Sequence, residues 1–188
     1  MVEKGEALPD YEPAMLGSMS SAMNEMKPNW YAAYTKPRHE KNVASQLGMR
    51  EVETYLPLYR TIHNWNGRKA EVDLPLFPGY VFVKVPVTER VRVLEQPGVV
   101  RLVGVNGKAT PLPDDEIEQL RSSLAFCKAE PYPFMVPGEK VRIRTGPMAG
   151  FEGKILRRKG KLRLLVSLDL IQSSIVIELD AGSARLAS

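Results

Sequence analysis

The chain has 188 residues, a formal net charge of +4 and a sequence pI near 9.2. Hydrophobic residues make up 44% and charged residues 26%, which is typical of a folded globular chain and excludes wholesale disorder. At about 150 residues per domain, the length allows one large domain or two small ones. The single cysteine, Cys127, excludes an internal disulfide framework and a cysteine-based zinc site, and two histidines, His39 and His63, leave little for metal chemistry.

No segment has the pattern of a membrane span or a secretory signal. The most apolar stretch runs from Leu74 to Val83 and contains Pro75, Pro78 and Gly79, whereas a membrane-spanning helix needs about 20 apolar residues. The first 25 residues lack a basic start followed by an apolar core. We therefore expect a cytoplasmic location.

Charge is distributed unevenly along the chain. Residues 1–29 carry a net charge of −3, residues 30–124 of +2 and residues 125–188 of +5. A basic C-terminal unit joined to a nearly neutral one indicates two modules with different partners. A solvated basic face kept for solubility explains the same charge equally well.

Residues 1–29 show no strand pattern, and we expect a disordered N-terminal extension. Four methionines with helical spacing form a possible apolar stripe, but nearby proline and glycine residues argue against a long helix. A start codon placed too early and a partner-binding helix are the alternatives. The methionines are Met15, Met19, Met23 and Met26.

Strands and helices alternate over residues 30–124, which predicts a compact α+β domain. Helices are expected at 38–50, where Pro37 suits the first turn, at 88–94, and after Pro113, where acidic residues favour a helix start. The expected strands are 30–35, 53–59, 74–85 and 99–105, with a hairpin or loop at 63–73 and a turn at Asn106-Gly107. The strand at 74–85 is expected to be interrupted early by Pro78-Gly79.

A proline-rich linker is expected at 125–136, because Pro131, Pro133 and Pro137 fall within seven residues. The pattern after it is all-β, with short alternating strands and glycine turns over 137–183. Because short strands leave exposed edges, a small closed barrel is the natural arrangement.

Four motifs in order identify a resemblance to the NusG family of bacterial transcription elongation factors. The resemblance covers about residues 30–180, and the linker falls where that family has one. The motifs are WYAAYTKPRHE at 30–40, PLFPGYVFV at 75–83, PGVV at 97–100, and GEKVRI at 138–143 with GPMAGFEG at 146–153. The short loop between the strands near Arg60 and Leu74 and the Pro131–Phe134 pattern look more like specialised paralogues, the RfaH-like or capsule-locus antiterminators.

This resemblance implies an α/β sandwich with an antiparallel sheet at 30–124, followed by a small SH3-like β-barrel, the KOW domain, at 137–183. It implies a factor that binds the RNA polymerase clamp, suppresses pausing or termination, and couples to the ribosome or Rho. The expected partners are the β′ clamp helices, the β subunit and the non-template DNA strand. The chain is expected to be a monomer without cofactor or metal.

Aromatic residues gather on the expected central strand and its neighbours. Tyr80 and Phe82 are two positions apart, so they share one face of the sheet. From the residues alone, ordinary core and a docking surface both remain open. The resemblance favours docking on the polymerase clamp helices by five residues: Tyr34, Phe77, Pro78, Tyr80 and Phe82.

The exposed side of the first helix is polar and partly basic, which suits either solvent or phosphate groups. The resemblance implies contact with non-template DNA in this region. The candidate nucleic-acid-binding residues are Lys36, Arg38, Gln46 and Arg50.

In the KOW-like module we expect structural glycines and an apolar partner-binding edge. Gly146, Gly150 and Gly153 mark turns or close chain approach, with Gly150 at a nearly invariant position of the family. Phe151, Ile171 and Ile175 are candidates for contact with a small-subunit ribosomal protein or Rho, or else for barrel core. The β-branched residues near the C-terminus predict a stable barrel rather than a helical hairpin.

Two other classes of function were weighed against this one. A ribosome-associated KOW protein that binds RNA explains the basic C-terminal unit but not the aromatic N-terminal module. An enzyme is not expected, because the chain has no phosphate-binding glycine loop and no H-E-x-x-H motif.

Overall fold

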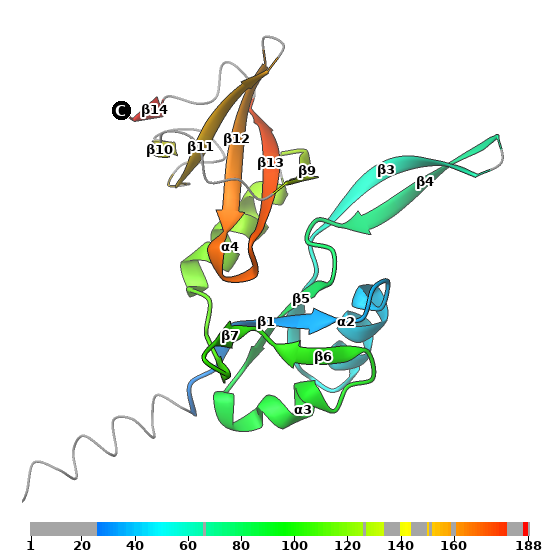
Figure 1. Cartoon of the computed structure of the whole chain (residues 1–188), viewed down its shortest axis with the longest axis vertical. Helices are drawn as coiled ribbons and strands as arrows, with labels where there is room; N and C mark the ends of the chain where they lie inside the picture. Colours follow the sequence, from blue (N-terminus) through cyan, green and yellow to red (C-terminus); the bar gives the residue numbers. More distant parts are fainter. Residues whose placement is uncertain are drawn as a thin grey trace, which may run out of the picture.

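The computed structural model describes residues 26–65, 67–125, 127–133, 140–143, 150, 152–158, 161–179 and 186–187 (Figure 1). The first half contains β1 (Asn29–Thr35), α2 (Glu40–Met49), β2 (Glu53–Tyr55), β3 (Leu58–Trp65), β4 (Arg68–Pro75), β5 (Tyr80–Val85), η1 (Val87–Glu89) and α3 (Arg90–Leu94). The second half contains β6 (Val99–Leu102), β7 (Gly104–Val105), β8 (Lys108–Ala109), α4 (Asp114–Leu124), β9 (Ala129–Tyr132), β10 (Lys140–Ile143), β11 (Glu152–Arg158), β12 (Lys161–Leu168), η2 (Asp169–Ile171), β13 (Ser173–Leu179) and β14 (Leu186–Ala187). The chain is α+β with antiparallel sheets, as the sequence predicted.

An antiparallel sheet in the order β2-β5-β1-β6 forms the centre of the N-terminal domain. β1 and β5 pair so that Tyr34 lies opposite Tyr80. Because side chains alternate along a strand, the sheet has two apolar faces. One face, with Tyr31 and Val83, packs against Val43 of α2 and Val93 of α3.

Helix α2 carries the apolar stripe expected from its sequence, since Val43 and Leu47 are fully buried. The helix begins at Glu40, later than the predicted start at Arg38. Arg38 has a φ of +64°, which no helical residue adopts, so the chain turns there before the helix starts.

β3 and β4 form a long two-stranded ribbon that extends away from the body of the domain (Figure 1). The sequence predicted a hairpin only at 63–73, with longer strands at 53–59 and 74–85. The predicted strand at 53–59 is broken, and the one at 74–85 is interrupted at Pro78-Gly79, as the sequence indicated. Pro57 separates β2 from β3, and the turn with Gly79 at φ +83° separates β4 from β5.

The C-terminal sheet has six antiparallel strands in the order β14-β10-β11-β12-β13-β9. β9 falls inside the range predicted as a linker and pairs with β13 at the sheet edge. An edge strand tolerates Pro131. Proline has no backbone N–H to donate, and a strand with a neighbour on one side only has no second neighbour that needs this donor. A closed barrel, as distinct from an open sheet, stays a prediction.

Helix α4 lies on the second face of the N-terminal sheet and also touches the C-terminal sheet. Acidic residues occupy its first turn, as predicted, and Ile117 and Leu120 are buried. One continuous cluster of buried side chains joins Trp30 and Phe77 of the N-terminal domain to Leu168 of the C-terminal sheet. The N-terminal and C-terminal sheets therefore share one core cluster.

Candidate functional site

The predicted docking surface reaches solvent through two tyrosines and a proline, Tyr34, Tyr80 and Pro78. We call the whole predicted surface the aromatic face; it consists of Tyr34, Phe77, Pro78, Tyr80 and Phe82. The rings of Tyr34 and Tyr80 are 5.5 Å apart between centroids and tilted by 51°. Both side chains are half-buried. The Arg101 guanidinium lies 5.6 Å from the Tyr34 centroid. Two rings that already pack against each other lose little side-chain entropy when a further apolar surface covers them.

The turn between β4 and β5 holds Pro78 at the surface. Gly79 N–H donates a hydrogen bond of 2.7 Å to Glu40 Oε1, and the Gly79 carbonyl accepts one of 2.8 Å from Thr35 N–H. Tyr80 N–H donates to the Phe77 carbonyl at 3.1 Å. The turn is therefore tied to α2 and β1 as well as to itself.

Phe77 and Phe82 are core residues in this structure. Their exposed fractions are 1% and 0%, and their rings meet edge to face with centroids 5.6 Å apart. Tyr55 stacks on Phe82 at 6.2 Å. Both phenylalanines belong to the buried cluster against which Tyr34 and Tyr80 pack.

Arg121 attaches α4 to the N-terminal sheet. Its guanidinium lies 5.3 Å from the Trp30 ring and 5.0 Å from the Tyr55 ring, and it pairs with Glu53 at 3.3 Å. Burial raises the pKa of Tyr55 to about 12, although the nearby Arg121 charge opposes the rise. Cation–π contacts with partly buried rings are stronger than exposed ones, so Arg121 fixes the position of the helix.

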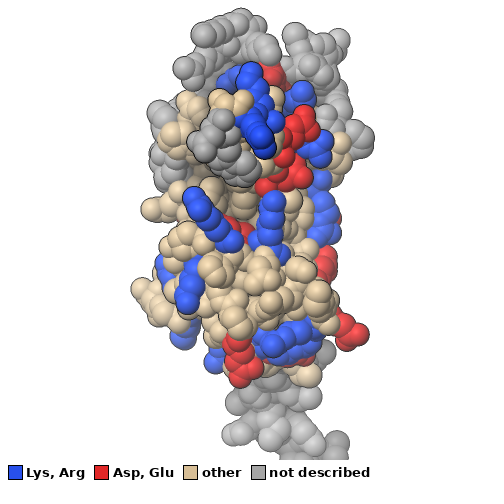
Figure 2. Space-filling view, turned by 90° about the vertical axis from the view of Figure 1, so that its right-hand side faces the viewer, with Lys and Arg blue, Asp and Glu red and all other residues tan. Residues whose placement is uncertain are grey.

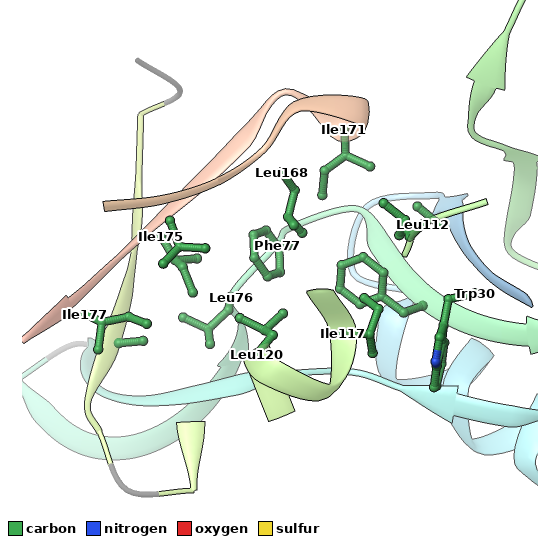
Figure 3. Close-up of a cluster of buried hydrophobic side chains, with 14 of the residues drawn as sticks. Trp30, Leu76, Phe77, Leu112, Ile117, Leu120, Leu168, Ile171, Ile175 and Ile177 are labelled. Carbon is green, nitrogen blue, oxygen red and sulfur yellow. The ribbon is translucent and has the colours of Figure 1, made fainter. Parts of the chain in front are cut away.

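The C-terminal sheet covers Phe77. Figure 3 shows Phe77 beside Leu168 and near Leu76 and Leu120. Leu168 is 1% exposed and Ile175 is fully buried. The sequence left partner contact and barrel core both open for Ile175, and the structure buries it. Phe77 therefore has no free surface while the two domains stay in contact.

Acidic groups meet where α4 faces the C-terminal sheet. A cavity of about 290 Å³ there is lined by Asp115 and Glu116 of α4 and by Arg142 of β10. Burial raises the pKa of Glu116, and the negative charges of Asp115 and Asp169 add to the rise. The folded chain therefore disfavours the charged form of Glu116.

The four candidate nucleic-acid residues do not gather at one point. Lys36 and Arg38 are exposed before α2 begins, and Arg50 is exposed at its other end. Gln46 is half-buried and hydrogen-bonded to both Gln96 and Asn42. Figure 2 shows the Lys and Arg side chains of one face in separate places rather than in one patch.

The C-terminal candidates are described only in part. Gly146 and Phe151 lie outside the described residues. Gly150 has a φ of +91°, and a Cβ on Gly153 would lie 2.5 Å from the Leu165 carbonyl oxygen. Ile171 is 4% exposed, so it is buried like Ile175.

Sequence analysis missed two residues that organise the site, Glu40 and Arg121. Glu40 occupies the same helical stripe as Val43 and Leu47, and a carboxylate on an apolar stripe is a signal of a buried hydrogen bond. Arg121 has no comparable signal, because its contacts come from distant strands.

The described part of the chain contains no group of three or more His, Cys, Asp or Glu side chains placed to hold a metal ion. None of its helices is long and apolar enough to cross a membrane.

Comparison with known proteins gives one consistent result. A family model described as "Transcription termination factor nusG" matches residues 28–121. The chain is 29% identical over 170 residues to the transcription termination/antitermination protein NusG of Pseudomonas aeruginosa, covering 82% of this chain and 96% of that protein. For the NusG protein of Escherichia coli K12 the identity is 27% over 176 residues, covering 86% and 97%.

A solved structure has the same fold. The Thermotoga maritima NusG structure described for its domain interaction superposes with a TM-score of 0.54 at 23% identity, covering 86% of this chain and 98% of that one.

Proposed function

Because the chain belongs to the NusG family of transcription termination and antitermination factors, we propose that it binds RNA polymerase through the aromatic face. The observation that carries this proposal is the half-buried pair of Tyr34 and Tyr80 beside the exposed Pro78. Two rings on neighbouring strands suit the apolar side of an amphipathic helix, such as the β′ clamp helices. Aromatic residues at the centre of an interface supply most of its binding energy.

Rigidity of the aromatic face supports the proposal. The hydrogen bonds of Gly79 to Glu40 and Thr35 hold the turn, and Phe82 is fully buried in the strand that follows it. A surface already held in its binding conformation loses little entropy when a partner arrives.

Docking on Phe77 requires the C-terminal sheet to move away. Phe77 packs in one cluster with Leu168 and Ile175, so a partner and the C-terminal sheet compete for the same ring. A partner that binds only the open form shifts the chain toward that form. The same movement exposes Ile171 and Ile175, the residues proposed for contact with a small-subunit ribosomal protein or Rho.

The proposed action on transcription needs no chemistry from this chain. Members of the family are non-enzymatic, and binding across the polymerase cleft favours a closed clamp over the open, paused state. The bound factor thereby suppresses pausing or termination. Non-template DNA is the second proposed contact, through Lys36, Arg38 and Arg50, whose exposed charges suit phosphate groups.

The experiment measures transcription through a defined pause site by purified bacterial RNA polymerase. We expect the wild-type chain to shorten the pause, Tyr80→Ala to lose most of the effect, and Val100→Ala, an exposed apolar change on β6, to retain it. An unchanged pause together with sedimentation of the chain with ribosomes contradicts the proposal and supports the alternative, a ribosome-associated RNA-binding protein.

A further inference from the structure

Three apolar side chains are exposed at the end of the N-terminal sheet where the chain enters β1. Met49, the last residue of α2, is 81% exposed, and Val91 and Leu94 of α3 are 51% and 40% exposed. We call these three residues the entry surface. Exposed apolar side chains that gather at one place on a folded domain mark an interaction site.

A contact between α2 and α3 brings the three side chains to the same end of the domain. Val91 and Leu94 are three positions apart in α3, so they lie on one side of that helix. The Arg92 guanidinium donates a hydrogen bond of 2.6 Å to the carbonyl of Arg50, the residue that follows Met49. The exposed side of α3 is thereby held next to the end of α2.

The N-terminal segment joins the domain beside this surface. Asn29, the first residue of β1, pairs with Val85, the last residue of β5, and the chain continues from Val85 into η1 and α3. Only Lys27 and Pro28 separate Asn29 from Met26. The side-chain amide of Asn29 donates a hydrogen bond of 2.9 Å to the Lys27 carbonyl, which holds this short link.

The exposure of Met49 is a consequence of how α2 ends. Glu51 N–H donates to the Gly48 carbonyl at 3.0 Å and Val52 N–H to the Leu47 carbonyl at 3.1 Å, while Glu51 has a φ of +61°. This is the Schellman arrangement, which satisfies the last carbonyls of a helix. The end of α2 is therefore closed by its own hydrogen bonds, and Met49 stays at the surface.

The segment before β1 has an apolar side of its own. Met19, Met23 and Met26 follow the i, i+4, i+7 spacing of one helix face. Met26, the first residue that the structure describes, is helical and 69% exposed. Pro28 disfavours helix at the residue before it, and Gly17 limits the other end. A helix over residues 18–26 would be about 13 Å long.

So short a helix needs a surface to cover its apolar side. An isolated helix of fewer than about 12 residues is marginal in water. Methionine side chains adapt to irregular apolar surfaces. Because the link to β1 is short, the local concentration of the segment at the entry surface is high, on the order of millimolar. The sequence left a disordered extension and a partner-binding helix both open, and the entry surface favours the helix.

We propose that residues 18–26 fold back as a helix and that their methionines cover Met49, Val91 and Leu94. The proposal goes beyond polymerase binding, since α2 and α3 pack on the side of the sheet opposite to the aromatic face. The occupant of the entry surface is thus a segment of the same chain, rather than a second copy or another protein.

Oxidation of Met49 by hydrogen peroxide in the full chain tests whether the entry surface is covered. An accessible methionine sulfur forms the sulfoxide faster than a covered one. Trypsin releases Met49 in the peptide 42–50, which contains no other methionine. Mass spectrometry of this peptide gives the initial rate of oxidation, before other methionines are modified.

Two variants of the N-terminal segment form a matched pair. Met23→Asp places a charge on the methionine face, and Ser21→Asp adds the same charge on the opposite side of the expected helix. If the segment is docked in about two thirds of the molecules, about one third stays reactive, so Met23→Asp should oxidise Met49 roughly threefold faster than the wild type. Ser21→Asp should oxidise it at the wild-type rate.

Two variants of the folded domain test the surface itself. Val91→Gln makes the entry surface polar, and it should raise the oxidation rate of Met49 as Met23→Asp does. Val105→Gln is the control, because Val105 is 58% exposed on the separate β7–β8 hairpin. Circular dichroism establishes that both variants are folded.

Equal oxidation rates in the wild type, Met23→Asp and Ser21→Asp overturn the proposal. It is also wrong if Val91→Gln behaves like Val105→Gln, since the segment then does not dock on α3. A wild-type rate that rises when the protein is diluted identifies a second copy as the occupant and contradicts docking within one chain. Because polymerase is absent from these assays, a failure of the polymerase proposal leaves their result unchanged.

Discussion

Glu40 and Gly79, 39 positions apart in the chain, are joined by a hydrogen bond of 2.7 Å from the Gly79 N–H to Glu40 Oε1. The bond links the first turn of α2 to the turn that carries Pro78. It explains why a carboxylate with only 5% exposure is tolerated in the core, since its oxygen is satisfied.

Replacing Glu40 by alanine should destabilise the chain. The Gly79 N–H then loses its acceptor, which costs about 1–3 kcal/mol. Glu40→Gln should cost less, because the amide oxygen still accepts. Urea denaturation gives the free energies of unfolding, with the exposed Glu95→Ala as the control. Equal stability of Glu40→Ala and Glu95→Ala contradicts the assignment.

Two glycines should respond to alanine in opposite ways. At Gly79 the φ of +83° is unfavourable for alanine, and a Cβ would lie 3.3 Å from Tyr34 Cε2, so we expect a loss of about 1–2 kcal/mol. At Gly48 in α2 a Cβ would meet nothing within 4 Å, so we expect a gain of about 0.5–1 kcal/mol. Thermal unfolding of both variants tests the difference in sign.

Glu116→Gln should stabilise the chain more at neutral than at acidic pH. The pKa of Glu116 is raised in the folded state, mainly by burial and then by Asp115 and Asp169. Folding therefore favours the protonated acid, and stability falls as pH rises from the unfolded to the folded pKa. Glutamine remains neutral at every pH. Denaturation of both proteins at pH 7 and pH 4 gives the free energies of unfolding. The gain from Glu116→Gln should be larger at pH 7 than at pH 4, and a larger gain at pH 4 contradicts the assignment to the raised pKa of Glu116.

The aromatic strand could be predicted from sequence, but its burial could not. Alternation placed Tyr80 and Phe82 on one face, and Tyr34 lies beside Tyr80 as expected. Nothing local indicated that Phe82 would be covered by Tyr55 and α4, or Phe77 by the C-terminal sheet. Such burial depends on contacts between segments distant in the chain.

Single residues limited the prediction of elements and sites. Pro57 divides a strand that looked continuous in the sequence, because a hydrophobic pattern carries less information than backbone conformation at a turn. Gln46 has the polar character of a nucleic-acid contact, yet it is hydrogen-bonded to Gln96, a partner 50 positions away.

Loosening the contact between the domains should increase polymerase binding. Leu168→Ala removes a side chain that packs in the same cluster as Phe77, which favours the open form. Leu165→Ala is the matched control, since Leu165 is equally buried in β12 but lies outside that cluster. Each change lowers stability by about 2–5 kcal/mol. Higher polymerase affinity for Leu168→Ala alone supports competition for Phe77, whereas equal effects of the two variants contradict it.

The most direct measurement is the affinity of purified core RNA polymerase for the full chain and for Tyr80→Ala, by biolayer interferometry. Circular dichroism first establishes that the variant is folded. Because Tyr80 is half-buried and its ring lies 5.5 Å from that of Tyr34 in a tilted pair, its truncation should weaken binding by at least tenfold, about 1.4 kcal/mol, while Val100→Ala binds as the wild type does. A folded Tyr80→Ala variant with unchanged affinity contradicts the account.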